Sequence, residues 1–155
     1  MNDTELRLKF AEGAKAWAEA KVHYLHRGFS FRGCDCGGLV VGIAKQLGLI
    51  DNYKMRMYPR DWNLHSGAGN YIVEEIEKIA NKIPNSEIDV GDIPIFRFGK
   101  CIAHVGVLLN KSTMCFAHSH SIAGHCWYAV LRNSNWSKRW VETYRLSNEK
   151  MVLYK

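Results

Sequence analysis

The most informative stretch of this 155-residue sequence is Gly33-Cys34-Asp35-Cys36-Gly37-Gly38-Leu39-Val40-Val41. Its glycines and its aspartate predict a turn, and the apolar run that follows predicts a helix that begins at or beside Cys36. The unpaired N–H groups and the macrodipole at a helix N-terminus favour a thiolate over a thiol. We therefore expect Cys36 to be a nucleophile with a lowered pKa, which requires a base elsewhere in the chain.

The chain around this stretch divides into a helical first half and a strand-rich second half. Apolar spacing predicts helices at about residues 3–24, 36–47 and 70–83, the second capped by Gly48 and the third stopped by Pro84. We expect strands at 92–98, 101–109, 114–120 and 125–131, a helical turn at 136–140, and a closing pair at 141–146 and 151–154. Pro94 indicates an edge strand or a strand start. The pattern predicts one α+β domain over residues 1–155, with N-terminal helices packed on a C-terminal antiparallel sheet.

Composition argues against several classes of partner. The formal net charge is +6, but no dense Lys/Arg block is interleaved with aromatic residues, so we expect no nucleic-acid partner. No apolar run approaches the roughly 18 residues of a membrane span, and the N-terminus does not read as a signal peptide. Five cysteines without an export signal favour free thiols over a disulfide framework.

A metal site is the main alternative use of these cysteines. Cys34 and Cys36 form a C-x-C pair, and further cysteines and histidines lie downstream. The short paired spacings typical of zinc sites are missing, apart from the interval between His120 and His125. We expect no metal and no cofactor.

Three histidines on the predicted strands are candidates for the base. His104 alternates with Val105 and so lies on the face opposite the apolar one. His118 and His120 share one face of the next predicted strand. If the two strands are hairpin neighbours, an imidazole from one can reach an imidazole from the other. Cysteine, histidine and an orienting polar group would then form a nucleophile–base–orienter set.

Four motifs follow one another in the order of a known family. They are a Tyr24–Gly28–Gly33 loop before Asp35-Cys36-Gly37-Gly38-Leu39-Val40, Gly91-Asp92 before a strand, His104-Val105-Gly106-Val107, and Phe116-Ala117-His118-Ser119. With the tryptophan-rich end at 136–146, the sequence resembles the NlpC family of papain-like cysteine peptidases, which are bacterial cell-wall hydrolases. The similarity is greatest to the compact type encoded in phages, prophages and gene-transfer-agent tail clusters.

The resemblance implies a papain-like NlpC-type fold and a role for each matching residue. Cys36 would be the nucleophile, His104 the general base and His118 the group that orients His104, with His120 as the alternative orienter. Tyr24 would help to bind the oxyanion, together with the backbone N–H of Cys36. The sequence departs from the family pattern at Gly37, where a serine is usual, and at Cys34, where an apolar residue is usual. We interpret Cys34 as a packing residue; the alternative is a regulatory disulfide with Cys36.

The function implied by the resemblance is hydrolysis of a peptide bond in peptidoglycan stems, typically the bond after the γ-linked D-glutamate. The expected partners are stem peptides and phage tail proteins. Without an export signal, the expected location is the host cytoplasm or the virion, from which a tail enzyme reaches the wall. The alternatives are a non-catalytic tail-tip component with the same fold and a thiol acyltransferase, since nucleophiles other than water can resolve a thioester.

Overall fold

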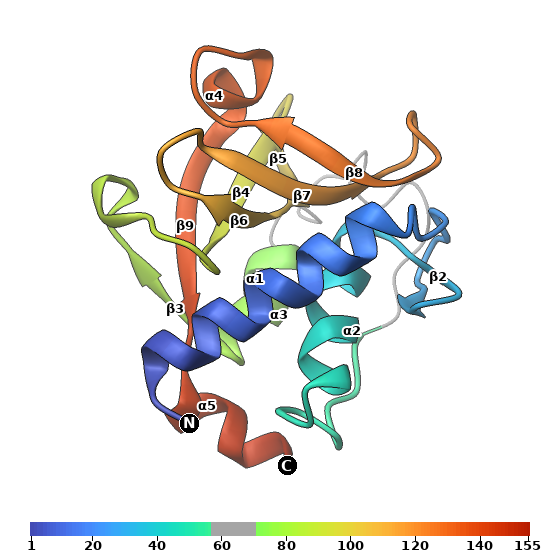
Figure 1. The fold of residues 1–155 in the computed structure, drawn as a ribbon, viewed down its shortest axis with the longest axis vertical. Coiled ribbons are helices and arrows are strands. Elements are labelled where there is room, and N and C mark those ends of the chain that lie inside the picture. Colours follow the sequence, from blue (N-terminus) through green and yellow to red (C-terminus); the bar gives the residue numbers. More distant parts are fainter. Residues whose placement is uncertain (57–70) are drawn as a thin grey trace.

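The structure is a computed structural model that describes residues 1–56 and 71–155. Its helices are α1 (Asp3–Glu19), α2 (Cys36–Gln46), α3 (Tyr71–Glu77), α4 (Asn135–Arg139) and α5 (Asn148–Met151), with short 3₁₀ turns η2 (Asn85–Glu87) and η3 (Val152–Tyr154). Its strands are β1 (Phe29–Ser30), β2 (Gly33–Cys34), β3 (Ala80–Ile83), β4 (Ile93–Phe98), β5 (Cys101–Val105), β6 (Val107–Asn110), β7 (Cys115–His120), β8 (His125–Val130) and β9 (Trp140–Leu146). The arrangement is α+β, as the sequence predicts (Figure 1).

Within the described residues the strands form antiparallel sheets of order β1-β2, β3-β9-β4-β5 and β6-β7-β8. The two larger sheets are joined where the chain passes from β5 to β6 at Gly106. A Cβ atom at that position would lie 2.6 Å from the ring of Phe116, so the close approach of the sheets requires glycine. The predicted single strand at 101–109 is therefore two strands in different sheets. Backbone bonds from Gly106 N–H to the Pro94 carbonyl and from Leu108 N–H to the Asp92 carbonyl keep the sheets in register.

The first two helices follow local sequence signals. Asn2 and Glu5 form a reciprocal capping box at the start of α1. Asp35 caps α2 by accepting a 2.7 Å hydrogen bond from Gly38 N–H. Helix α1 ends at Glu19 rather than near Tyr24, because the backbone of residues 22–25 instead bonds to Cys34 and Cys126.

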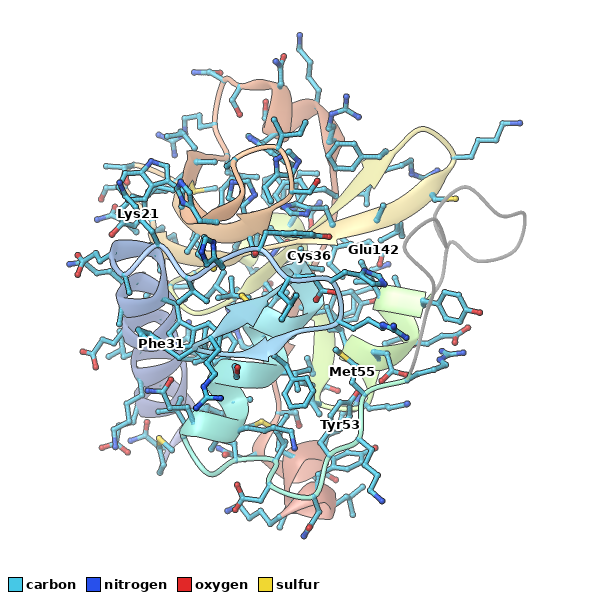
Figure 2. All side chains as sticks on the ribbon, turned by 90° about the vertical axis from the view of Figure 1, so that its right-hand side faces the viewer. Lys21, Phe31, Cys36, Tyr53, Met55 and Glu142 are labelled. Carbon is cyan, nitrogen blue, oxygen red and sulfur yellow. The ribbon has the colours of Figure 1, made fainter. Side chains whose placement is uncertain are left out.

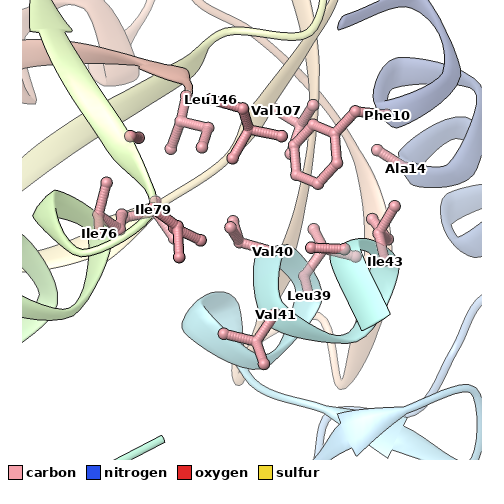
Figure 3. Close-up of a cluster of buried hydrophobic side chains, with 14 of the residues drawn as sticks. Phe10, Ala14, Leu39, Val40, Val41, Ile43, Ile76, Ile79, Val107 and Leu146 are labelled. Carbon is pink, nitrogen blue, oxygen red and sulfur yellow. The ribbon is translucent and has the colours of Figure 1, made fainter. Parts of the chain in front are cut away.

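Helix α2 occupies the centre of the hydrophobic core. Its buried residues pack between α1 and the strands, with α3 on the far side (Figure 3). The residues that meet there include Phe10, Ala14, Leu39, Val40, Ile43, Ile76, Ile79, Val107 and Leu146. Because α2 is buried on most of its faces, its first residue is held in a fixed position relative to the sheets.

Two sequence predictions about the second half are wrong in detail. The third helix ends at Glu77, and residues 80–83 form β3, paired with β9 from Ala80–Leu146 to Ile83–Thr143; the predicted start at Asn70 lies outside the described residues. Residues 151–154 belong to α5 and η3, so β9 pairs with β3 and β4 rather than with a closing strand. In both cases a pairing distant in sequence outweighed the local pattern.

Of the two alternatives for Pro94, the strand start is confirmed. Pro94 is the second residue of β4, which is flanked by β9 and β5 and so is not an edge strand.

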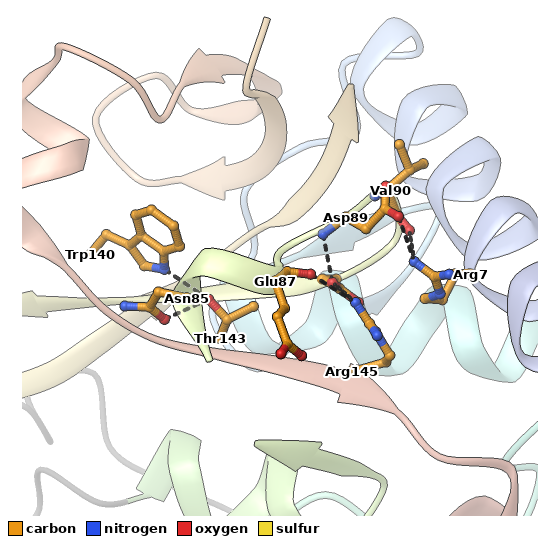
Figure 4. Close-up of polar contacts among 9 residues, drawn as sticks. Arg7, Asn85, Glu87, Asp89, Val90, Trp140, Thr143 and Arg145 are labelled. Atoms are coloured by element: carbon orange, nitrogen blue, oxygen red, sulfur yellow. Dashed lines mark hydrogen bonds and ion pairs between the residues drawn. The ribbon is translucent and has the colours of Figure 1, made fainter. Parts of the chain in front are cut away.

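A buried ion pair anchors the strand that faces the candidate site. The Asp92 carboxylate is fully buried and accepts hydrogen bonds from Arg145 Nε at 2.8 Å and Nη2 at 2.7 Å (Figure 4). Asp89 N–H donates to the same carboxylate, and Arg7 of α1 lies 3.4 Å from the Asp89 carboxylate. The Gly91-Asp92 motif thus ties α1, the start of β4 and β9 together.

No helix within the described residues is both long and apolar enough to cross a membrane.

Candidate active site

Cys36 is the first residue of α2, in the turn that Asp35 caps. The turn is tight: a Cβ on Gly38 would lie 1.7 Å from the Gly28 carbonyl oxygen, so the preceding loop packs directly on the helix start. The Cys36 Sγ lies 3.9 Å from the carbonyl oxygen of Ala103 on β5. The predicted nucleophile is therefore held against the strand that carries His104 (Figure 2).

The expectation of a lowered Cys36 pKa is wrong. Burial, with a smaller contribution from the Asp35 carboxylate, raises the pKa of the Cys36 thiol to about 12. Backbone N–H groups of Val105, Gly37 and Cys36 itself act in the opposite direction, as expected at a helix N-terminus, but they are outweighed. The thiol is consequently protonated near neutral pH, and it needs a neighbouring base to become a nucleophile.

His104 and His118 form a buried pair of imidazoles. The Nε2 of His104 lies 2.7 Å from the Nδ1 of His118, and both side chains are buried. Burial is the main cause that lowers the pKa of His104 well below its usual value and that of His118 to about 4. Both rings are therefore neutral at pH 7. A His104 that accepts a proton at Nδ1 carries its own hydrogen on Nε2 and donates it to His118.

The geometry favours His118 over His120 as the hydrogen-bond partner of His104, and its role as the orienting group stays a prediction. His120 is half-buried, and its ring centroid lies 5.4 Å from that of His104 and 5.6 Å from that of His118. It is the Nδ1 of His118, however, that lies within hydrogen-bonding distance of His104. Strands β5 and β7 are not hairpin neighbours, since β6 lies between them in the chain and pairs with β7. The two imidazoles nevertheless meet, from strands of different sheets.

A cavity of about 350 Å³ opens beside Cys36. The predicted site residues Tyr24, Cys36, His104 and His120 line it, whereas His118 lies behind His104. The cavity is of the size that accommodates a small ligand or part of a peptide. The structure thus brings Tyr24 to the same cavity as the nucleophile, and its role in binding an oxyanion stays a prediction.

Other cavity residues were not identified from the sequence. Tyr53, Met55 and Arg56 reach it from the segment after α2, and Glu75 and Ile76 reach it from α3 (Figure 2). Glu75 accepts hydrogen bonds from Tyr53 and Lys78 and lies 3.5 Å from the Arg56 guanidinium. No motif marks these residues; an aromatic and charged segment just after a buried helix was the only signal available.

Cys34 points away from Cys36. Its Sγ lies 3.4 Å from that of Cys126 on β8, and both residues are fully buried in the core. The interpretation of Cys34 as a packing residue is confirmed, and a Cys34–Cys36 disulfide does not fit this arrangement. Across residues 1–56 and 71–155, no group of three or more Cys, His, Asp or Glu side chains is arranged to hold a metal ion.

Comparison with known proteins identifies the family of this fold. The model of the NlpC/P60 family matches residues 21–145. No curated protein matches the chain. Among solved structures, an NlpC/P60 family protein from Bacillus cereus ATCC 10987 aligns with a TM-score of 0.64 at 18% identity, over 90% of this chain and 40% of that protein.

Two further structures show the same fold. NlpC2 from Trichomonas vaginalis has a TM-score of 0.62 at 18% identity, over 90% of this chain and 45% of that one. The NlpC/p60 domain of the peptidoglycan hydrolase SagA has a TM-score of 0.59 at 14% identity, over 91% and 97% of the two chains. This chain thus spans less than half of the first two structures and nearly the whole of the SagA domain.

Proposed function

Since this chain belongs to the NlpC/P60 family, we propose that it is a cysteine peptidase that hydrolyses peptide bonds in peptidoglycan. The observation that carries the proposal is the 2.7 Å contact between His104 Nε2 and His118 Nδ1, at a cavity of about 350 Å³ that His104 lines together with the helix-start residue Cys36. The resemblance of four ordered sequence motifs to cell-wall peptidases supports the substrate class. The similar fold of the SagA domain, which comes from a peptidoglycan hydrolase, agrees with it.

The mechanism follows from a neutral thiol next to a neutral imidazole. As the Cys36 sulfur attacks the peptide carbonyl, the thiol proton passes to His104 Nδ1, and the tetrahedral oxyanion forms. The Cys36 backbone N–H and the Tyr24 hydroxyl are the proposed oxyanion donors. His104 then protonates the departing amine and leaves a thioester on Cys36. Water, deprotonated by His104, attacks the thioester, releases the carboxylic acid and restores the thiol.

Because the Cys36 thiol and the His104 imidazole are both neutral in the free protein, charges separate only during the reaction. Desolvation opposes both the Cys36 thiolate and the His104 imidazolium in the free protein. During attack the negative charge moves to the substrate oxygen, where hydrogen-bond donors can stabilise it. The His118 Nδ1 accepts the Nε2–H of the imidazolium at the same time. These interactions strengthen in the transition state, which is the condition for a rate enhancement.

The finer proposal concerns the bond and the biological setting. We propose cleavage after the γ-linked D-glutamate of the stem peptide, by an enzyme associated with a phage tail or encoded by a prophage. The support is the resemblance of the motifs and of the tryptophan-rich end at 136–146 to that type of enzyme. A virion-borne enzyme assembled in the host cytoplasm would reach the wall from outside.

Acyl transfer is a second candidate because much of the cavity wall is apolar. Val40 and Val41 of α2 line it together with Ile76 and Ile79. An apolar wall limits access of water to a thioester and leaves time for an amine to attack it instead. Transfer would join the acyl group to that amine and release the Cys36 sulfur, with the same first half-reaction.

The test is digestion of purified peptidoglycan, followed by mass spectrometry of the released peptides. We expect cleaved stems from the wild type and from Cys101→Ala, which removes a half-buried thiol outside the cavity, and none from Cys36→Ala. Matched peptides with γ- and α-linked D-glutamate test the bond, and an added amine acceptor tests transfer. Equal turnover by Cys36→Ala, or no turnover by any variant while the chain binds tail proteins, would overturn the enzymatic proposal.

A further inference from the structure

Trp136 is in contact with every histidine of the site. Its ring centroid lies 5.1 Å from that of His104, with the planes tilted by only 31°. The same indole meets His118 edge-on at 4.9 Å and His120 edge-on at 5.5 Å. No sequence motif assigns it a role; by sequence it was one aromatic residue in a tryptophan-rich end.

The indole is held in place from two sides. Its backbone belongs to the first turn of α4, where Ser134 Oγ accepts hydrogen bonds from the N–H groups of Trp136 at 3.2 Å and Ser137 at 3.3 Å. In turn, the Ser137 hydroxyl oxygen accepts a hydrogen bond from Ser134 N–H. On the other side, Phe96 lies edge-on to the indole at 5.1 Å. A short helix with a complete capping box therefore presents a fixed aromatic surface to the histidines.

His104 needs such a support because a single hydrogen bond does not fix the plane of its ring. The rings that contact it are His118 and His120 from β7, Phe96 and Phe98 from β4, and Trp136 from α4. Cys36 of α2 and Arg56 line the same cavity as His104, and Arg139 of α4 stacks on Phe98 at 4.3 Å. Among the described residues, no carboxylate forms an ion pair with His104.

We propose that Trp136 is a positioning residue for His104. Its indole would hold the imidazole plane with Nε2 bonded to His118 and Nδ1 turned to the cavity that Cys36 lines, and would keep water from the His104–His118 hydrogen bond. The proposal rests on the proposed function only in taking Cys36 and His104 as the reacting pair. Two features of the geometry support it. The tilted ring contact, at 31° between the planes, covers one face of the imidazole, and the edge contact with His118 covers the other partner of the hydrogen bond.

The chain offers a matched control in Trp140, at the end of the same helix. Trp140 is also half-buried and packs on the same apolar cluster as Trp136. Its Nε1–H donates to the Glu142 carbonyl at 3.1 Å and to Thr143 Oγ1 at 3.0 Å, away from the site (Figure 4). Within the part of the chain that the structure describes, its ring contacts none of the three histidines. Loss of Trp140 should affect stability and leave the geometry of His104 unchanged.

The experiment measures the rate of Cys36 alkylation by iodoacetamide as a function of pH, followed on the Cys36 peptide by mass spectrometry. For Trp136→Leu we expect the plateau rate to fall about tenfold, because a misoriented base no longer accepts the thiol proton. We also expect the acid limb to move to higher pH, since water that reaches the ring relieves the burial that lowers the pKa of His104. Trp136→Phe, which retains a flat ring, should restore most of the rate.

Trp140→Leu should lower the melting temperature and keep the wild-type pH profile. The proposal is overturned if folded Trp136→Leu keeps the wild-type profile, or if Trp140→Leu changes the profile in the same way. Should Trp136→Leu fail to fold, the comparison of Trp136→Met with Trp140→Met, which also remove the flat ring, decides by the same criteria. His104→Ala is the separate check on the reacting pair: unchanged alkylation there would contradict the proposed mechanism, independently of peptidoglycan and of Trp136.

Discussion

Replacement of His118 by alanine tests most directly how the candidate site is built. The substitution removes the Nδ1 that accepts the His104 Nε2–H over 2.7 Å. A neutral hydrogen bond contributes about 1 kcal/mol, and a buried donor left without a partner costs a further 1–3 kcal/mol or so. His104 is 5% exposed, so water compensates little of this loss. If this loss falls on the transition state, where His104 becomes charged, the total of about 2–4 kcal/mol corresponds to a fall in kcat/KM of about 30- to 900-fold.

The assay is kcat/KM on a soluble stem peptide, with circular dichroism to confirm that each variant is folded. His118→Asn supplies a side-chain oxygen as acceptor, so we expect it to recover part of the loss. His120→Ala removes a ring that lines the cavity but not the hydrogen bond to His104, and we expect it to change kcat/KM by less than about threefold. Equal losses for His118→Ala and His120→Ala, or a loss below threefold for folded His118→Ala, would refute the reasoning.

Three further predictions concern stability and thiol access. Asp92→Ala leaves the Arg145 guanidinium without its buried partner; since that side chain is 29% exposed, we expect a loss of about 3 kcal/mol in urea unfolding. The pKa of His118 is lowered to about 4, so the unfolded state binds more protons as the pH falls through 6.5, and His118 alone should lower the free energy of unfolding by about 2 kcal/mol between pH 7 and pH 5; His104, whose pKa is also lowered by burial, adds to this loss. Cys34 and Cys126 should resist iodoacetamide until the protein unfolds, because both are fully buried.

Each of these predictions has its own control. Lys82 and Glu142 form an exposed ion pair, and Lys82→Ala should cost well under about 1 kcal/mol, which separates the Asp92 effect from a general loss of charge. The pH dependence should be shallower in His118→Asn than in the wild type; parallel curves would contradict its assignment to His118. Labelling of Cys126 in the folded protein at the rate of the half-buried Cys115 would contradict the packing described for it.

The protonation state of the free site predicts that the reactivity of the Cys36 thiol depends on the group bound in the cavity. Both the Cys36 thiol and the His104 imidazole are neutral in the free protein, because burial disfavours either charge. A reactive thiolate is therefore formed only when a bound group can share the charge. Such a site should react slowly with small electrophiles relative to a thiolate–imidazolium pair, and faster with an acyl donor that fills the cavity.

Elements that depend on interactions over a few residues were predictable from the sequence. The Asn2 capping box, the Asp35 cap and the apolar stripe from Leu39 to Ala44 each act within one or two turns of helix, so α1 and α2 were predictable. Cys36 and the candidate histidines were identifiable for the same reason, from a glycine-rich turn and from the alternation of side chains along strands.

How these elements meet depends on contacts between residues that are distant in sequence. Residues 80–83 form a strand because their backbone groups pair with β9. Gly106 permits the close approach at which the predicted strand 101–109 divides between two sheets. The same crossing placed His118, rather than His120, at 2.7 Å from His104. The Cys36 pKa was likewise beyond local reasoning: the helix N-terminus favours a thiolate, but the burial created by packing α2 against β5 is the larger effect. Burial depends on residues distant in sequence, so no local pattern contains it.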